Sequence, residues 1–324
     1  MKLLIKLIKN LATSDYAVII LLFALILVVG PFSPNFFKLQ NIMNVLERTA
    51  VTATAAIGVT YVIISGGIDL SIGGIVVLVA YIGVDTLIDV MGINIFVALL
   101  MMIIFGGIIG FLNGFSIVVL GMPPFIATLA MLSMTRGLSL FMFEAKTLYG
   151  LPKLYVFFGQ GEAFGIPMPI LIFLFSFLIG FFVLRNTVFG RSVYAVGNNK
   201  KAAWLAGINV NRTILSVYVI SGMTAAVASI ILSSRLEAVV GTLGVGLELD
   251  IISAVVIGGT SLLGGEGNIL GSIVGALIIS IVGNMLTLMK ISPYIQELSK
   301  GVVLWVAVLA DMARKGYISR KLSE

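Results

Sequence analysis

Long runs of apolar residues dominate this chain, and charged residues fall mostly between those runs. A helix needs about 20 apolar residues to cross the hydrocarbon core of a bilayer. The run 90–135 suffices for two spans, with Pro123 and Pro124 as the break because proline cannot continue a helix interior. The last span begins near Tyr294 and requires Lys300 to extend its side chain to the membrane interface. The remaining runs predict one span each: 16–37, 49–68, 70–87, 163–184, 213–234, 251–265 and 267–289. The pattern predicts an all-α polytopic membrane protein with about ten transmembrane helices.

Composition agrees with a lipid environment. Of 324 residues, 60% are hydrophobic and 10% are charged, and the mean hydropathy is +1.17, whereas soluble chains carry roughly 25% charged residues. Ten spans place both termini on one side with 12 Lys and Arg residues, against seven on the other. Positive charge marks the cytoplasmic side, which predicts cytoplasmic termini. The 12 are Lys2, Lys6, Lys9, Arg185, Arg191, Lys200, Lys201, Arg212, Arg314, Lys315, Arg320 and Lys321.

Missing residue types exclude several classes of function. The chain has no Cys and no His, which removes thiol chemistry, histidine metal sites and histidine proton relays. No basic run with interleaved aromatic residues is present, so we expect no nucleic-acid partner. The phosphate-binding pattern G-x-x-x-x-G-K-[ST] is absent, so ATP is not expected to bind by that route. A membrane enzyme is disfavoured because general acid–base pairs are hard to assemble from these residues.

Glycines form two kinds of pattern. Two stripes with a spacing of four, Gly106-Gly110-Gly114 and Gly267-Gly271-Gly275, predict close helix packing. Two clusters with the pattern G-G-x-x-L-x-x-G begin at Gly66-Gly67 and at Gly258-Gly259, 192 positions apart. They indicate either an internal duplication or a chance match. Both clusters fall between spans at the cytoplasmic side, where they form tight turns or the discontinuous helices that build transport sites.

Polar residues inside apolar runs are candidates for function. Asp69 interrupts the stretch from 49 to 84, where a carboxylate is costly unless it is paired or hydrated. It either caps a helix that starts near Leu70 or lines a cavity or gate. Asn113 and Arg136 either bond to a neighbouring helix or, for Arg136, extend to the interface.

The loop 185–212 contains a short helix with an apolar tip. Asn199 is a good N-cap and Gly207 a good stop signal, which predicts a helix from Lys200 to Ala206. Two turns are unstable alone in water, and Trp204 and Leu205 would be exposed. The helix therefore docks into a partner's groove or packs on the chain's own surface.

At this loop the sequence resembles a known family. Residues 201–207, K-A-A-W-L-A-G, are similar to the E-A-A-x-x-x-G loop of permease subunits in bacterial ABC importers. The segments 66–71, 246–250 and 257–262 add a resemblance to the ribose-type monosaccharide permeases, and the match covers nearly the whole chain. One position departs from the pattern: Lys201 stands where glutamate is usual. Lysine is unfavourable at a helix N-terminus, so we expect acidic groups on the partner to compensate.

The resemblance implies a single permease domain over 1–324 in a bacterial cell membrane. It implies a cytoplasmic ABC ATPase that binds ATP and magnesium, an extracytoplasmic sugar-binding protein, and a second copy or a related permease as partners. The chain itself would hold no cofactor and no metal. The coupling helix would use Asn199, Lys200, Lys201, Ala202, Ala203, Trp204, Leu205 and Gly207.

Import by alternating access is the function that these features predict. A sugar path needs hydroxyl and amide groups rather than fixed charges. The candidates for the path or gate, each of which could instead bond helix to helix, are Gly66, Gly67, Asp69, Ser71, Asn113, Thr128, Gly258, Gly259, Thr260, Ser261 and Asn284. The sequence leaves the sugar open, and an ion- or proton-coupled secondary transporter of a small polar solute is the alternative.

Overall fold

The computed structural model describes residues 17–29 and 34–314. These residues are mostly helical, as the apolar pattern predicts. The first half contains α2 (Ala17–Val29), α3 (Leu39–Ile64), α4 (Ile72–Tyr81), the π-helix η2 (Ile82–Val90), α5 (Ile95–Val118), α6 (Pro124–Met142), β1 (Leu148–Tyr149) and α7 (Lys153–Gln160). The predicted break at the proline pair is confirmed, because α5 ends before it and α6 starts at Pro124.

The second half repeats long helices but interrupts them more often. It contains β2 (Glu162–Ala163), β3 (Ile166–Pro167), α8 (Met168–Asn186), α9 (Val188–Asn198), α10 (Lys200–Leu205), α11 (Val210–Leu236), β4 (Ala238–Val239), α12 (Leu247–Ile257), α13 (Ile269–Leu288) and α14 (Pro293–Arg314). The strands have two residues each and pair antiparallel as β1–β4 and β2–β3. They are small additions to an α-helical protein.

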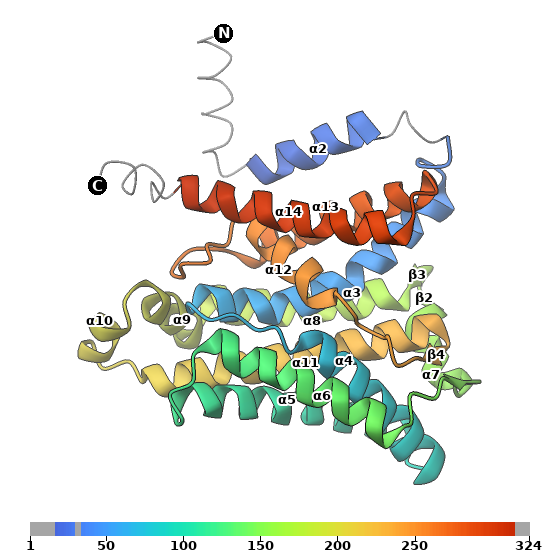
Figure 1. Cartoon of the computed structure of the whole chain (residues 1–324), viewed down its shortest axis with the longest axis horizontal. Helices are drawn as coiled ribbons and strands as arrows, with labels where there is room; N and C mark the ends of the chain where they lie inside the picture. The colour runs from blue at the N-terminus through green and yellow to red at the C-terminus, as the bar shows by residue number, and fades with distance from the viewer. Residues whose placement is uncertain (1–16, 30–33, 315–324) are drawn as a thin grey trace.

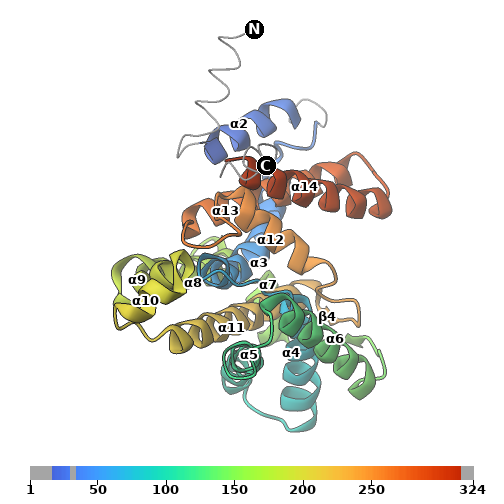
Figure 2. The same ribbon diagram turned by 60° about the vertical axis from the view of Figure 1, so that its left-hand side comes forward.

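The long helices lie roughly side by side, and the two ends of the molecule differ (Figure 1). Helices α9 and α10 lie at one end, and the strands and α7 lie at the other. In two views α2, α13 and α14 lie on one side of α3, while α4, α5, α6 and α11 lie on the other (Figure 2). Helix α3 therefore runs through the middle, which explains why every residue from Thr49 to Ile64 is buried.

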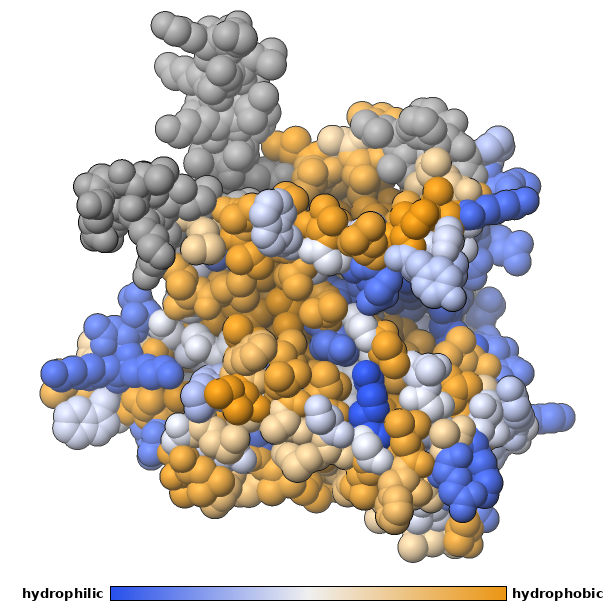
Figure 3. Space-filling model, viewed as in Figure 1, coloured by the Kyte–Doolittle hydropathy of each residue, from blue (hydrophilic) through white to orange (hydrophobic). Residues whose placement is uncertain are grey.

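Six helical segments of the described chain are long and apolar enough to cross a membrane: Ile72–Val90, Ile95–Val118, Pro124–Met142, Met168–Asn186, Val210–Leu236 and Ile269–Leu288. Apolar side chains cover the middle of the visible face, and hydrophilic residues gather at its two ends (Figure 3). The other predicted spans lie on shorter or more polar helices. Of the positive charges used to orient the chain, Lys2, Lys6, Lys9, Lys315, Arg320 and Lys321 lie outside the described residues.

The glycine stripes bring helices into close contact, as predicted, except at Gly267, which lies before the start of α13 with φ +147°. A methyl group at Gly106 would collide with the carbonyl of Gly222 on α11, and one at Gly110 with the carbonyl of Tyr218. In the second stripe, Gly275 meets the carbonyl of Ala254 on α12 in the same way. These glycines are needed because a side chain would force the two backbones apart.

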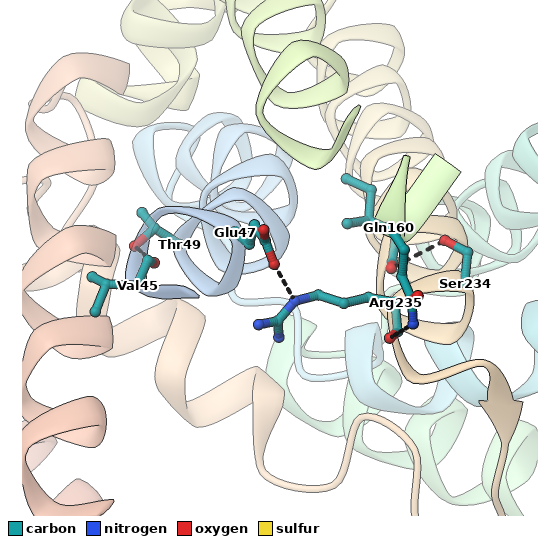
Figure 4. A network of polar contacts seen from close by, with 7 residues as sticks. Val45, Glu47, Thr49, Gln160, Ser234 and Arg235 are labelled. Carbon is teal, nitrogen blue, oxygen red and sulfur yellow. Dashed lines mark hydrogen bonds and ion pairs between the residues drawn. The ribbon is translucent and has the colours of Figure 1, made fainter. Parts of the chain in front are cut away.

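Ion pairs join helices near the end opposite α10. Arg235 Nε at the end of α11 lies 3.0 Å from Glu47 Oε2 on α3, and the Arg235 carbonyl accepts a bond from Gln160 of α7 (Figure 4). Lys300 Nζ on α14 lies 3.0 Å from Asp250 Oδ2 on α12. The ammonium group of Lys300, which we expected to extend to the interface, is thus held by a carboxylate on the neighbouring helix.

Candidate functional site

The short helix α10 forms at the predicted place. The Asn199 side chain accepts a 2.9 Å hydrogen bond from the Ala202 amide, which satisfies one of the free donors of the first turn. Gly207 adopts a left-handed conformation with φ +82°, as its role as stop signal requires. The helix ends at Leu205, one residue earlier than predicted, and Ala206 is its C-cap.

One face of α10 packs on the protein and the rest is open. Ala203 is 4% exposed and lies among apolar residues of α3, α9 and α11. Trp204 and Leu205 are 67% and 70% exposed, and Lys200, Lys201 and Ala202 are exposed as well. Two large apolar side chains thus stand clear of the chain's own surface, at the end of the molecule beyond the apolar band.

The two glycine clusters form the same turn. In each, a helix ends in a Schellman motif: Gly66 donates to Ile63 and Gly67 to Val62 after α3, while Gly259 donates to Val256 and Thr260 to Val255 after α12. Gly66 and Gly259 are the left-handed residues, with φ +80° and +88°. These two left-handed glycines are 193 positions apart. The sequence pattern gave a spacing of 192 because it paired Gly66 with Gly258, the first glycine of each cluster.

The two turns touch each other and α9. The Gly265 amide donates a 2.8 Å hydrogen bond to the Ile64 carbonyl. Gly197 on α9 lies so close that a methyl group there would overlap the Ile64 carbonyl oxygen. Tyr194 Oη donates to the Gly267 carbonyl at 2.8 Å. The segment that leads into α10 therefore rests directly on both turns.

Asp69 is fully buried at the first turn and is held by hydroxyl groups. Its Oδ1 accepts bonds from the Ser71 amide at 2.9 Å and the Ser71 hydroxyl at 2.6 Å, and its Oδ2 accepts from Ser221 of α11 at 2.7 Å. Asn113 of α5 donates to the Ser71 hydroxyl at 2.8 Å. The helix that follows begins at Ile72 rather than near Leu70, so Asp69 stabilises the turn before the helix and is not its N-cap.

The other polar candidates fall into two groups. Thr128 Oγ1 bonds to the Pro124 carbonyl and to the Ile68 carbonyl of the first turn, and Asn284 forms a reciprocal amide pair with Asn41 at 2.8 and 3.1 Å. These contacts join helices. Ser261 Oγ lies 3.3 Å from Asp311 Oδ2. Thr260 Oγ1 is buried and finds no hydrogen-bond partner within 17–29 and 34–314.

Two charged residues beside α4, Glu248 and Arg136, were not predicted to lie near each other. Glu248 in the first turn of α12 is 8% exposed, and both its Oε2 and the Arg136 Nε and Nη2 atoms on α6 are buried without a hydrogen-bond partner in the described part of the chain. A methyl group at Gly73 would meet the Glu248 carboxylate and lie 3.3 Å from Arg136 Nη2. The sequence shows both residues, but only the packing of three helices brings them together.

No group of three or more His, Cys, Asp or Glu side chains that could hold a metal ion occurs in the residues that the structure describes. The buried polar side chains are mostly those of serine and threonine, and the buried carboxylates are Asp69, Glu248 and Asp250.

Comparisons with known proteins give a consistent result. Residues 41–310 match the family described as branched-chain amino acid transport system / permease component. The ribose import permease protein of Haemophilus influenzae is 38% identical over 90% of this chain and 91% of its own length, and that of Bacillus subtilis is 40% identical over 90% of each chain. The xylose transport system permease protein of Escherichia coli is 32% identical over 86% of each chain. No solved structure matches.

Proposed function

The chain belongs to the permease component family of branched-chain amino acid transport systems, and we propose that it is the membrane-spanning subunit of an ATP-driven importer for a monosaccharide. The observation that carries this proposal is the identity of 38–40% to ribose import permeases over 90% of the chain. The protein is a multi-pass protein of the bacterial inner membrane. It is a transport subunit and not an enzyme.

We propose ten membrane crossings with both termini in the cytoplasm. Besides the six apolar segments, α2, α3 and α14 run roughly along the long axis of the molecule (Figure 1). Helix α12 is short, with 11 residues, and continues into the second glycine turn, as a discontinuous helix would. The excess of Lys and Arg on the side of α10 supports this orientation.

Helix α10 couples the permease to a cytoplasmic ATPase in this proposal. The exposed Trp204 and Leu205 form the apolar anchor, and Lys200 and Lys201 supply positive charge beside it. A short helix with large apolar side chains at its tip suits a groove on a partner. ATP and magnesium are bound by that partner, because this chain lacks the phosphate-binding loop.

The contacts between α9 and the two glycine turns suggest how a movement of α10 reaches the membrane interior. Gly197, Ile64 and Gly265 form one backbone contact, so a shift of α9 displaces both turns. The first turn carries Asp69 and Ser71, and the second carries Thr260 and Ser261. We propose that these turns form part of the gate, and that a sugar passes along nearby hydroxyl and amide groups when the gate changes state.

The proposal also assigns the remaining partners. Sugar is delivered by an extracytoplasmic binding protein, and the permease pairs with a second copy or a related permease. Ribose is the first substrate to test because several relatives carry that name, and xylose and allose follow from others.

Reconstitution tests the function directly. The full chain is placed in liposomes with the ATPase encoded beside its gene and the neighbouring binding protein, and uptake of labelled ribose, xylose and allose is measured. We expect uptake that requires ATP and both partners. Uptake by the permease alone under a proton or sodium gradient would instead identify a secondary transporter and refute the proposal.

A further inference from the structure

A groove opens between four helices at the same end of the molecule as α10. It is formed by α2, the last turn of α8, α9 and the start of α13, and its volume is about 550 Å³. The two views place these helices beside one another, with α2 and α13 above α8 and α9 (Figure 2). This size lies within the range of roughly 300–1,000 Å³ that is typical of binding pockets.

The walls of the groove are apolar. Phe181 and Leu184 of α8 line one side, and Ile269 and Val274 of α13 line the other, with Ile19 of α2 at the edge. Leu184 and Ile269 are 4% and 1% exposed, so this part of the wall belongs to the packed interior. The groove suits a hydrocarbon chain better than a sugar, because a sugar needs closely spaced hydrogen-bonding groups.

The mouth of the groove is positively charged. Arg185 at the end of α8 and Arg191 on α9 both line it, and neither forms an ion pair with any residue in the described part of the chain. Arg185 Cζ lies 5.5 Å from the centre of the Phe181 ring, which holds the guanidinium at the edge of the apolar wall. None of the 12 lining residues is acidic. The first turn of α13, capped by Asn268, adds its positive dipole end.

Apolar walls and a basic mouth that has no ion pair among the described residues, at the end of apolar helices, fit one kind of ligand. We infer that this groove binds a membrane phospholipid with an anionic headgroup, its phosphate between Arg185 and Arg191 and an acyl chain along Phe181 and Val274. Basic pockets between transmembrane helices bind anionic headgroups because the phosphate neutralises the arginines and the chain covers apolar surface. This assignment does not depend on which solute the protein transports.

The bound lipid contacts the joint between the membrane helices and the α9–α10 segment. Tyr194 of α9 lines the groove and donates to Gly267 in the second glycine turn, and Gly258 of that turn also lines the groove. An anionic lipid would therefore link α8, α9 and α13 at the point where they meet. We expect it to stabilise this joint as well as to occupy the groove.

Lipid retention by the intact chain tests the inference. The full-length permease is purified in mild detergent, titrated with phosphatidylglycerol, and analysed by native mass spectrometry alongside its Arg185→Gln/Arg191→Gln variant. Phosphatidylcholine with the same acyl chains serves as the neutral lipid. We expect phosphatidylglycerol to bind the parent chain and the double variant to bind it about ten-fold or more weakly, as befits two basic side chains near an anionic headgroup.

Three controls make the experiment decisive. Arg212→Gln removes one exposed positive charge at the same end of the molecule outside the groove, and it should leave retention unchanged. Val274→Trp fills the groove and should reduce retention without a change of charge. An excess of inorganic phosphate should not displace the lipid. The lipid site would be overturned by any of four results. The Arg185→Gln/Arg191→Gln variant retains as much lipid as the parent chain, or Arg212→Gln loses as much lipid as that double variant. Alternatively, Val274→Trp loses no lipid, or inorganic phosphate displaces the lipid.

Discussion

The backbone amide of Gly265 donates a hydrogen bond of 2.8 Å to the backbone carbonyl of Ile64. These two residues lie 201 positions apart in the chain, at the ends of the two glycine turns. A backbone bond leaves little room for adjustment, and Gly197 of α9 packs against the same carbonyl. The two turns and α9, which leads into α10, are thus in direct backbone contact.

Gly197→Ala tests this contact. The added methyl group would overlap the Ile64 carbonyl oxygen and lie 2.7 Å from the Gly265 amide nitrogen, so α9 must move away from the turns. We expect a loss of about 1–3 kcal/mol in unfolding free energy, as for overpacked sites, and reduced ATP-dependent uptake. Gly137→Ala on α6 is the matched control, because nothing lies within 4 Å of its added methyl group and alanine favours a helix by up to about 1 kcal/mol. Unchanged stability and uptake in Gly197→Ala would contradict the contact.

Asp69→Ala should destabilise the first turn. The carboxylate accepts three hydrogen bonds in a fully buried site, and its removal leaves Ser71 and Ser221 without their acceptor. Hydrogen bonds to charged groups contribute about 1.5–3 kcal/mol each at most, so we expect a lower melting temperature in detergent together with lost uptake. Asp89→Ala, at an exposed carboxylate in η2, should change neither quantity. Equal effects of the two substitutions would show that the network is unimportant.

A double-mutant cycle on Asp250 and Lys300 measures the contact between α12 and α14. The pair is 3.0 Å apart, and the two side chains are 11% and 24% exposed. Lys300→Gln alone leaves the mostly buried Asp250 carboxylate without this partner. We expect the unfolding free energy to fall by about 2 kcal/mol, because the site is partly open to solvent. Adding Asp250→Asn should recover part of that loss, with a coupling energy of about 0.5–3 kcal/mol in chemical unfolding. Strictly additive losses would mean that the pair does not interact.

The double variant Trp204→Ala/Leu205→Ala distinguishes a role of α10 in binding the ATPase from a role in folding. Both side chains are about two-thirds exposed, so the melting temperature of the isolated permease should stay the same. Co-purification of the ATPase and uptake should both be lost, because the apolar anchor of α10 is gone. Tyr149→Ala removes a side chain that is 79% exposed at the other end of the molecule and should leave ATPase binding intact. Normal co-purification with the double variant would refute the docking role.

Lys201→Glu probes the charge on the partner. Glutamate suits the first turn of a helix better than lysine by a few tenths of a kcal/mol, so α10 itself should not be weakened. If acidic groups on the ATPase face Lys201, association should weaken at low ionic strength, and the difference should shrink in high salt because exposed charges are screened. Lys153→Glu, at the start of α7 on the opposite end, is the control. Association that is unchanged at low salt would remove the proposed charge complementarity.

Local patterns predicted where the short helix α10 and the two glycine turns lie. Asn199 and Gly207 bound α10 as expected, because a capping side chain and a left-handed glycine act within a few residues of the helix that they limit. Both glycine clusters end helices for the same reason. The sequence pattern aligned Gly66 with Gly258, whereas the structure aligns Gly66 with Gly259. The pattern does not show which glycine of a pair takes the left-handed conformation.

Long-range contacts could not be predicted in this way. The packing of α4, α6 and α12 brings Glu248 and Arg136 to the same place beside Gly73, and Lys300 pairs with Asp250 on α12. Asn284, a candidate either for the path or for a bond between helices, bonds to Asn41 on α3. Each of these outcomes depends on which helices are neighbours, and apolar periodicity carries no information about neighbours inside a membrane.

The sequence by itself determined that the chain is helical and membrane-embedded, where α5 and α6 are divided, and where the short helix α10 and the two turns lie. Those properties follow from the hydrophobic length needed to cross a bilayer and from local backbone preferences. Only the tertiary structure decided that both turns meet at Ile64 and Gly265, that α9 rests on them, and that Arg185 and Arg191 line one groove. The physical reason is that backbone contacts and charge clusters between helices arise from packing in three dimensions, which joins residues far apart in the chain.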